Sequence, residues 1–224
     1  MNRLAKLSPH RIAEVSLKLI DTKGLPAFSI RAVAKALKVV PMALYNHVQD
    51  KAELAALVLH HATTKRPLPP LTGDWVKDLL MTARWLRSNA TAHPMLGTLE
   101  RTYAVWTPVM VEVAERWTTV WRQSGLNSKN ALRAASASGM ALRGLIEHQA
   151  TMREWTPQGE ETLSRSPNAQ RYFRDAADRE ELFDLAVRSV IEGLYANLST
   201  EKRSTGRELS TPKPRRGRSR ISSR

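Results

Sequence analysis

The chain has 224 residues, of which 42% are hydrophobic and 25% are charged, and it contains no cysteine. This composition is that of a globular chain with a sizeable core, and it excludes disulfide frameworks and thiolate metal sites. No apolar run approaches the roughly 20 residues that span a bilayer, and no signal-peptide core follows the basic start, so we expect a cytoplasmic protein.

The net charge of +14 is concentrated at the two ends of the chain. Residues 1–51 contain 9 basic and 3 acidic residues, residues 199–224 contain 9 and 2, and the middle contains 17 and 16. Charge that serves only solubility would be spread more evenly. The distribution therefore favours a polyanion, such as nucleic acid, as the partner of the ends.

The first helix is expected to begin at Pro9, with Ser8 as its N-cap, and to end at Gly24. Its apolar residues recur at helical spacing, so one face can pack behind the helices that follow.

Two short helices joined by a tight turn are predicted over residues 29–51. In the first, apolar residues recur at i, i+3, i+4 and i+7 from Ile30, and Ser29 stands at the N-cap position. Pro41 opens the second helix, in which Leu44 and Val48 continue the apolar face. Such a pair is a helix-turn-helix, whose second helix enters the DNA major groove.

The outward side chains of this second helix are the candidate DNA contacts. Asn46 can both donate to and accept from a base edge, and Met42 and Ala43 can touch thymine methyl groups. Tyr45 and His47 suit phosphate oxygens, which fix register without reading sequence. The alternative is a surface packing unit with no role in DNA binding.

Residues 43–54, ALYNHVQDKAEL, resemble the recognition helix of the tetracycline-repressor (TetR) family. The resemblance covers about the first 60 residues and implies a ligand-responsive, homodimeric transcription regulator, most often a repressor. It also implies that Arg31, Tyr45 and Lys51 contact DNA. Lys38 departs from the family pattern, which has glycine there, so we expect a slightly different turn. The predicted DNA-binding residues are Ser29, Arg31, Pro41, Met42, Ala43, Tyr45, Asn46, His47 and Lys51.

The chain divides into four predicted segments. A helix-turn-helix domain with a fourth, connecting helix occupies residues 1–64, and a Pro-rich linker follows at 65–73. Residues 74–198 are predicted to be helical, because no long segment alternates with period two. The resemblance implies that this part of the chain is a ligand-binding and dimerisation domain. Residues 199–224 are predicted to be a disordered basic tail. The fold class is therefore all-α.

Two helical stripes of small residues, on 128–153 and on the last helix, suit close helix packing. They indicate either a four-helix dimer interface or an ordinary core, and the resemblance favours a homodimer. A dimer would read a palindromic double-stranded DNA operator with half-sites one turn apart.

Aromatic and methionine side chains in 75–155 are candidates for lining a site for a small hydrophobic effector, with a few polar residues fixing its orientation. For any single one of them, a core position is the simpler interpretation. The candidates are Trp85, Tyr103, Trp106, Met110, Trp117, Trp121, Met140, Arg143 and His148.

No catalytic constellation, cofactor motif or metal-ligand spacing stands out, so we predict neither an enzyme nor a metal or cofactor site. Three alternatives remain open. One is an activator, or a regulator that answers to a protein partner. Another is a helical enzyme or carrier whose basic ends are incidental. The third is an architectural protein that binds DNA without regard to sequence.

Overall fold

The computed structural model describes residues 7–151, 161–162, 164–168 and 179–204. These residues form helices and connecting segments and contain no strand, which confirms the predicted all-α fold class. Within them no helix is long and apolar enough to cross a membrane. The elements are α1 (Pro9–Lys23), the 3-10 turn η1 (Leu25–Ala27), α2 (Ile30–Leu37), α3 (Pro41–Tyr45), α4 (Lys51–Thr64), α5 (Trp75–Ala92), α6 (Leu96–Tyr103), α7 (Pro108–Gln123), α8 (Ser128–Thr151) and α11 (Arg179–Ser204).

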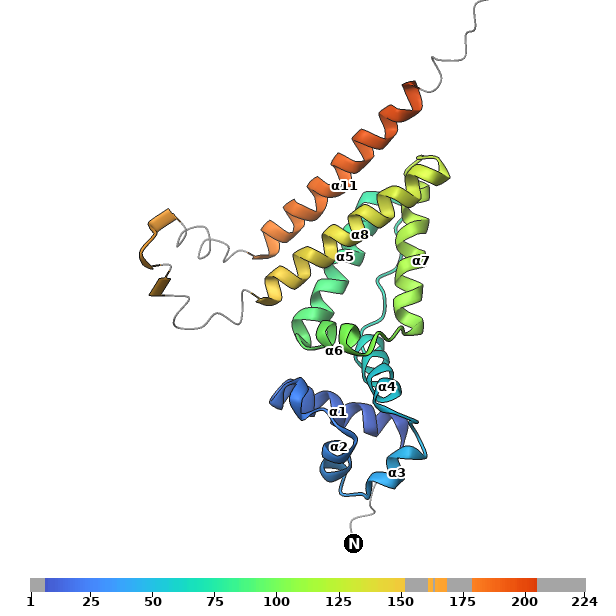
Figure 1. The fold of residues 1–224 in the computed structure, drawn as a ribbon. Helices are drawn as coiled ribbons and strands as arrows, with labels where there is room; N and C mark the ends of the chain where they lie inside the picture. The colour runs from blue at the N-terminus through green and yellow to red at the C-terminus, as the bar shows by residue number, and fades with distance from the viewer. Residues whose placement is uncertain (1–6, 152–160, 163, 169–178, 205–224) are drawn as a thin grey trace, which may run out of the picture.

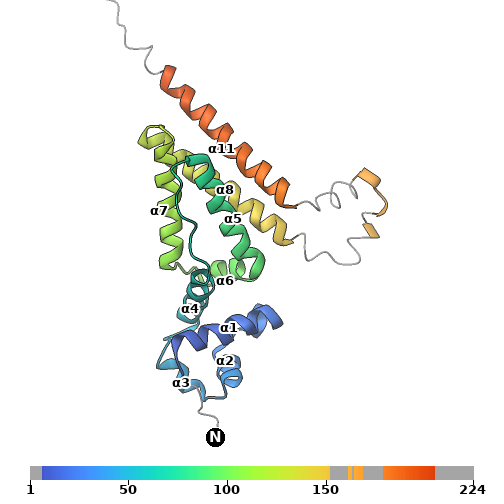
Figure 2. The ribbon, with the colours of Figure 1, turned by 180° about the vertical axis from the view of Figure 1, so that it is seen from behind.

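The molecule is elongated, with α1, α2 and α3 at one end and a helical body at the other (Figure 1). Helix α4 leads from the first group towards the body. Seen from both sides, α8 and α11 run next to each other along one flank of the body (Figure 2). We call α1 to α4 the head and the remaining helices the body.

Local capping explains where the head helices begin. The Ser8 hydroxyl accepts from the Arg11 amide at 3.3 Å, and the Ser29 hydroxyl accepts from the Ala32 amide at 3.2 Å. At the start of α4 the Asp50 carboxylate accepts from the Glu53 amide at 2.8 Å. Each bond satisfies an amide that has no partner within its own helix. The predicted starts of α1 and α2 are confirmed.

Two hydrophobic cores hold the protein together, and α6 belongs to the first of them. Leu96 and Leu99 of α6 are buried together with the core side chains of the head. The second core joins α5, α7, α8 and α11 around Trp121 and Phe183. Thus α6 follows the Pro-rich segment in the sequence but packs against the head.

The Pro-rich segment between α4 and α5 is tied to the body by hydrogen bonds. The buried Asp78 carboxylate accepts from the Thr72 amide at 2.8 Å, from the Thr72 hydroxyl at 2.8 Å and from the Gly73 amide at 3.1 Å. Burial alone would raise the pKa of Asp78, but these bonds and the nearby charge of Arg116 outweigh it and lower the pKa. Arg116 also donates to the Pro69 carbonyl. The segment is therefore anchored along its length.

Helix α11 continues past the predicted start of the basic tail at residue 199 and ends at Ser204. The prediction of disorder from residue 199 is thus wrong for the first six residues. The rest of the predicted tail lies outside the described residues.

Candidate nucleic-acid interface

The turn between α2 and α3 has the left-handed geometry that glycine usually provides, although Lys38 occupies the position. Lys38 has φ 59° and ψ 40°, and the amide of Val39 closes the turn on the Ala34 carbonyl at 3.0 Å. The expectation that lysine would alter this turn is wrong. The backbone bonds hold a side-chain-bearing residue in a conformation that is unfavourable for it by about 1 kcal/mol.

Helix α3 is shorter than predicted, since it ends at Tyr45 rather than near Val48. The amides of His47 and Val48 both bond to the Leu44 carbonyl, at 2.9 and 3.0 Å, which tightens the chain into a turn. Leu44 and Val48 are nevertheless both buried in the first core, as their spacing predicted. The short helix is thus held against α1 and α2 by these two side chains.

Most of the predicted DNA-binding side chains on α2, on α3 and directly after α3 are exposed. Met42 is 71% exposed and Tyr45 is 48% exposed, and Pro41, Asn46 and Arg31 are also exposed. Ala43 and His47 are half-buried beside them. The hydroxyl of Ser29 caps α2, so its role in the structure is to start that helix.

The exposure of Val40 was not predicted from the sequence. Its side chain is 67% exposed directly before Pro41. Its backbone is extended, with φ −74° and ψ 147°, as is usual for a residue that precedes proline. That rule was a signal that the Val40 side chain would project beyond the helix start rather than pack in the turn.

Lys51, predicted to contact the DNA backbone, lies at the junction of head and body. Its Nζ stands 5.6 Å from the ring centre of Phe28 and 5.3 Å from that of Tyr103, distances typical of cation–π contacts. The two rings meet edge to face with centroids 5.9 Å apart. Tyr103 of α6, predicted to contact an effector, thus packs on the head and positions Lys51.

A buried histidine lies where α4 meets α1. His61 packs edge-on against His10 with ring centroids 4.7 Å apart, and its Nε2 is buried without a hydrogen-bond partner. Burial, followed by the positive charges of Lys65 and His10, lowers the pKa of His61 below 6.5, whereas Glu14 opposes the shift. The folded head therefore favours a neutral imidazole.

We expect the free energy of unfolding to fall as the pH is lowered from 7.5 to 5.5. The unfolded chain protonates His61 below about pH 6.5, before the folded chain does, so protons favour unfolding by at most about 1.4 kcal/mol per pH unit. Urea denaturation of the protein and of His61→Gln at both pH values measures how much of the pH dependence of the free energy of unfolding comes from His61. His60→Gln, a change of the exposed neighbouring histidine, is the control. An unaltered pH slope in His61→Gln would contradict the prediction.

The predicted effector-binding residues are not gathered around one space. Trp106 and Met140 are 67% and 72% exposed, and the Trp85 indole donates to the Arg66 carbonyl at 3.1 Å in the Pro-rich segment. Arg143 pairs with Glu100 of α6 at 3.1 Å, so it ties α8 to α6. His148 is exposed on α8, and Met110 is half-buried on α7.

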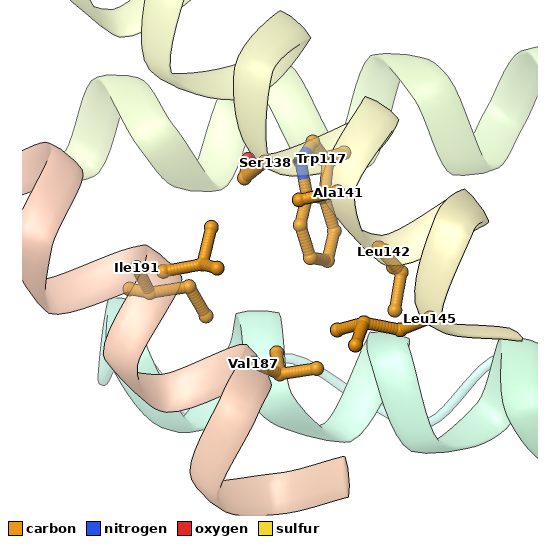
Figure 3. Close-up of a pocket in the computed structure, with 8 residues that line it drawn as sticks. Trp117, Ser138, Ala141, Leu142, Leu145, Val187 and Ile191 are labelled. Carbon is orange, nitrogen blue, oxygen red and sulfur yellow. Dashed lines mark hydrogen bonds between the residues drawn. The ribbon is translucent and has the colours of Figure 1, made fainter. Parts of the chain in front are cut away.

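A small cavity of about 10 Å³ lies between α7, α8 and α11, and Trp117 is the one predicted effector residue that lines it. Figure 3 shows apolar side chains from α8 and α11 facing each other across it. The volume suffices for about one water molecule. The lining residues are Trp117, Ser138, Ala141, Leu142, Leu145, Val187, Val190 and Ile191.

The hydroxyl of Ser138 is the polar centre of this region. It accepts from the indole nitrogens of Trp117 and Trp121, each at 3.0 Å, and donates to the Ala134 carbonyl at 2.6 Å. One donor and two lone pairs are all that a serine hydroxyl has, so Ser138 is fully used. Both tryptophans are buried, and the cavity offers no free polar group from Ser138 or Trp117.

Fold and surface together define a helix-turn-helix DNA-binding protein, and comparisons with known proteins agree. Residues 12–58 match the bacterial regulatory proteins of the tetR family. The chain is 28% identical over 207 residues to the tetracycline repressor protein class E of Escherichia coli, covering 89% of this chain and 96% of that protein. A transcriptional regulator of Streptomyces coelicolor, a TetR, has a similar structure, with 25% identity, a TM-score of 0.64 and coverage of 85% of this chain and 98% of that one.

ActR of Streptomyces coelicolor, solved in complex with actinorhodin, gives a TM-score of 0.70 at 24% identity and covers 88% of this chain and 99% of that one. At this identity the likeness concerns the fold. Taken with the match over residues 12–58, the comparisons show that the chain is similar to TetR-family transcriptional regulators in its head and in its fold.

Proposed function

We propose that this protein is a cytoplasmic, homodimeric repressor that binds a palindromic operator and is released from it by a small hydrophobic effector. It acts by binding and catalyses no reaction. The observation that carries the proposal is the exposure of Arg31, Tyr45 and Asn46 on a helix-turn-helix whose first helix is capped by Ser29. Phosphate contacts from Arg31, Tyr45 and Lys51 would set the register, and Asn46 would read a base edge.

Exposed apolar side chains on α8 and α11 support the dimer. Leu182 and Leu185 of α11 are 47% and 61% exposed, and Leu132 and Met140 of α8 are 55% and 72% exposed. Large apolar side chains on neighbouring helices are typical of an interface between subunits. We propose that these two helices meet their copies across a two-fold axis.

The small residues of α8 that were expected at this interface pack inside the chain instead. Ala131, Ala134 and Ser138 are buried against the other helices of the body. The part of α8 that is available to a second subunit is the opposite face, which carries Leu132 and Met140. The stripe of small residues on α8 is therefore core, which was the alternative interpretation.

The apolar cavity between α8 and α11 supports the proposal that an effector binds between these two helices. At about 10 Å³ it is too small for a ligand, so binding would require α11 to move away from α8. Such a movement would change the spacing of the two heads. A differential affinity of about 1–3 kcal/mol between the two arrangements would weaken operator binding about 5–150-fold. The relative ActR was solved with actinorhodin, which is a precedent for a small-molecule ligand on this fold.

The test is a selection of binding sequences from random duplex DNA at about 150 mM salt, where phosphate attraction alone does not dominate. We expect a palindrome whose half-sites are one or more helical turns apart. Recovery of no preferred sequence would favour the architectural alternative and would overturn the proposal. Transcription from a promoter that contains the recovered site would then separate a repressor from an activator.

A further inference from the structure

We propose that α3 and its N-cap select A·T base pairs, with Val40 and Met42 contacting the C5 methyl groups of thymine. This inference rests on the proposed function, since it names what the helix-turn-helix reads. It adds Val40 as a residue that determines specificity.

Apolar exposure in the head is confined to one place. Among the described residues of the head, the exposed large apolar side chains are Val40 at 67%, Met42 at 71% and Tyr45 at 48%. All three lie on α3 or on its N-cap, whereas Leu44 and Val48, on the other side, are buried. The apolar surface is thus presented by the element that a helix-turn-helix inserts into the major groove.

The charge around this surface favours DNA as its occupant. Residues 22–49 contain no Asp or Glu, and Arg31, Lys35 and Lys38 are exposed on α2 and in the turn. None of these three forms an ion pair within the part of the chain that the structure describes. Cations that flank an apolar strip match phosphates on either side of a groove in which the thymine methyl is the apolar feature.

The same segment lacks the groups that read guanine or cytosine. Guanine is read chiefly by Arg or Lys, and cytosine by Asp or Glu, yet residues 40–48 contain none of these. Asn46 is exposed, and its amide suits the N6 and N7 atoms of adenine. Methyl contacts from Val40 and Met42 and an amide contact from Asn46 are together the chemistry of an A·T pair.

The experiment compares two random duplex pools, one synthesised with thymine and one with uracil, which lacks the methyl group. We expect the thymine pool to yield half-sites with A·T pairs at the positions facing α3. Replacing thymine by uracil at those positions should weaken binding about fourfold for each methyl group removed. Removing one methyl group from each of the two half-sites should therefore weaken binding about tenfold or more.

The double variant Val40→Ala/Met42→Ala should bind the thymine and uracil duplexes equally, with unchanged secondary structure because both side chains are exposed. Val111→Ala, which removes an exposed valine from α7, is the matched control and should discriminate as the original chain does. If the double variant still prefers thymine, the preference comes from DNA shape and the inference is wrong.

The failure of this inference can be told apart from that of the proposed function. If neither pool yields a preferred sequence, the proposed function is overturned, and the inference falls with it. A palindrome recovered from both pools with equal affinity, or one with G·C pairs facing α3, would overturn the inference alone.

Discussion

Replacing Leu185 with Asp is expected to convert the protein into a monomer and to weaken operator binding about 100-fold. Leu185 is 61% exposed on α11, beside the similarly exposed Leu182. In a two-fold interface the substitution is present twice, so two carboxylates would be buried among apolar side chains. A monomer loses the second, linked half-site, and such linkage contributes about 10²–10⁴ in affinity.

Sedimentation of the variant, followed by titration of a selected palindromic duplex, measures both effects. Leu71→Asp is the matched control, because Leu71 is a 45% exposed leucine in the segment between α4 and α5. It should leave both the dimer and the affinity intact. A Leu185→Asp protein that remains dimeric would show that the subunits meet elsewhere.

The head could be predicted in detail because its signals are local. Ser8, Ser29 and Asp50 each cap the helix that follows within three residues, so the sequence alone locates those starts. The end of α3 could not be predicted in this way. The spacing of Leu44 and Val48 fits a helix and also fits the tighter turn that the structure forms.

The body could be predicted only in outline, because the partners of its side chains lie far away in the sequence. Tyr103 lies within the predicted effector-binding domain, yet it packs on Phe28 of the head. Trp85 is a large aromatic residue of the kind that lines ligand pockets, but its indole donates to the Arg66 carbonyl and so holds the Pro-rich segment. Hydrophobicity shows that such side chains are buried against something, and only the fold shows against what.

The small residues of α8 illustrate the same limit. Small side chains at helical spacing permit close approach of another helix, whether it belongs to the same chain or to a second one. Ala131 and Ala134 meet helices of their own chain, and the exposed Leu132 beside them shows which face remains available. A leucine one position away from a buried alanine cannot be assigned to an interface before the helix is oriented.

Ser138→Ala, the removal of one oxygen atom, is expected to lower the free energy of unfolding by roughly 2–6 kcal/mol. The indole N–H groups of Trp117 and Trp121 both donate to Ser138, and without it two buried donors have no partner. Each unsatisfied donor costs about 1–3 kcal/mol, and the whole domain is stabilised by only about 5–15 kcal/mol.

Urea denaturation followed by circular dichroism measures this loss, and Ser136→Ala, an exposed serine of the same helix, is the control that should change stability by less than about 0.5 kcal/mol. If Ser138→Ala costs less than about 1 kcal/mol, the indoles have found water in the adjoining cavity. That result would mean that the space between α8 and α11 opens readily to water or to another polar molecule. A large loss would instead show a dry, closed region that only an apolar effector can enter without leaving buried donors unpaired.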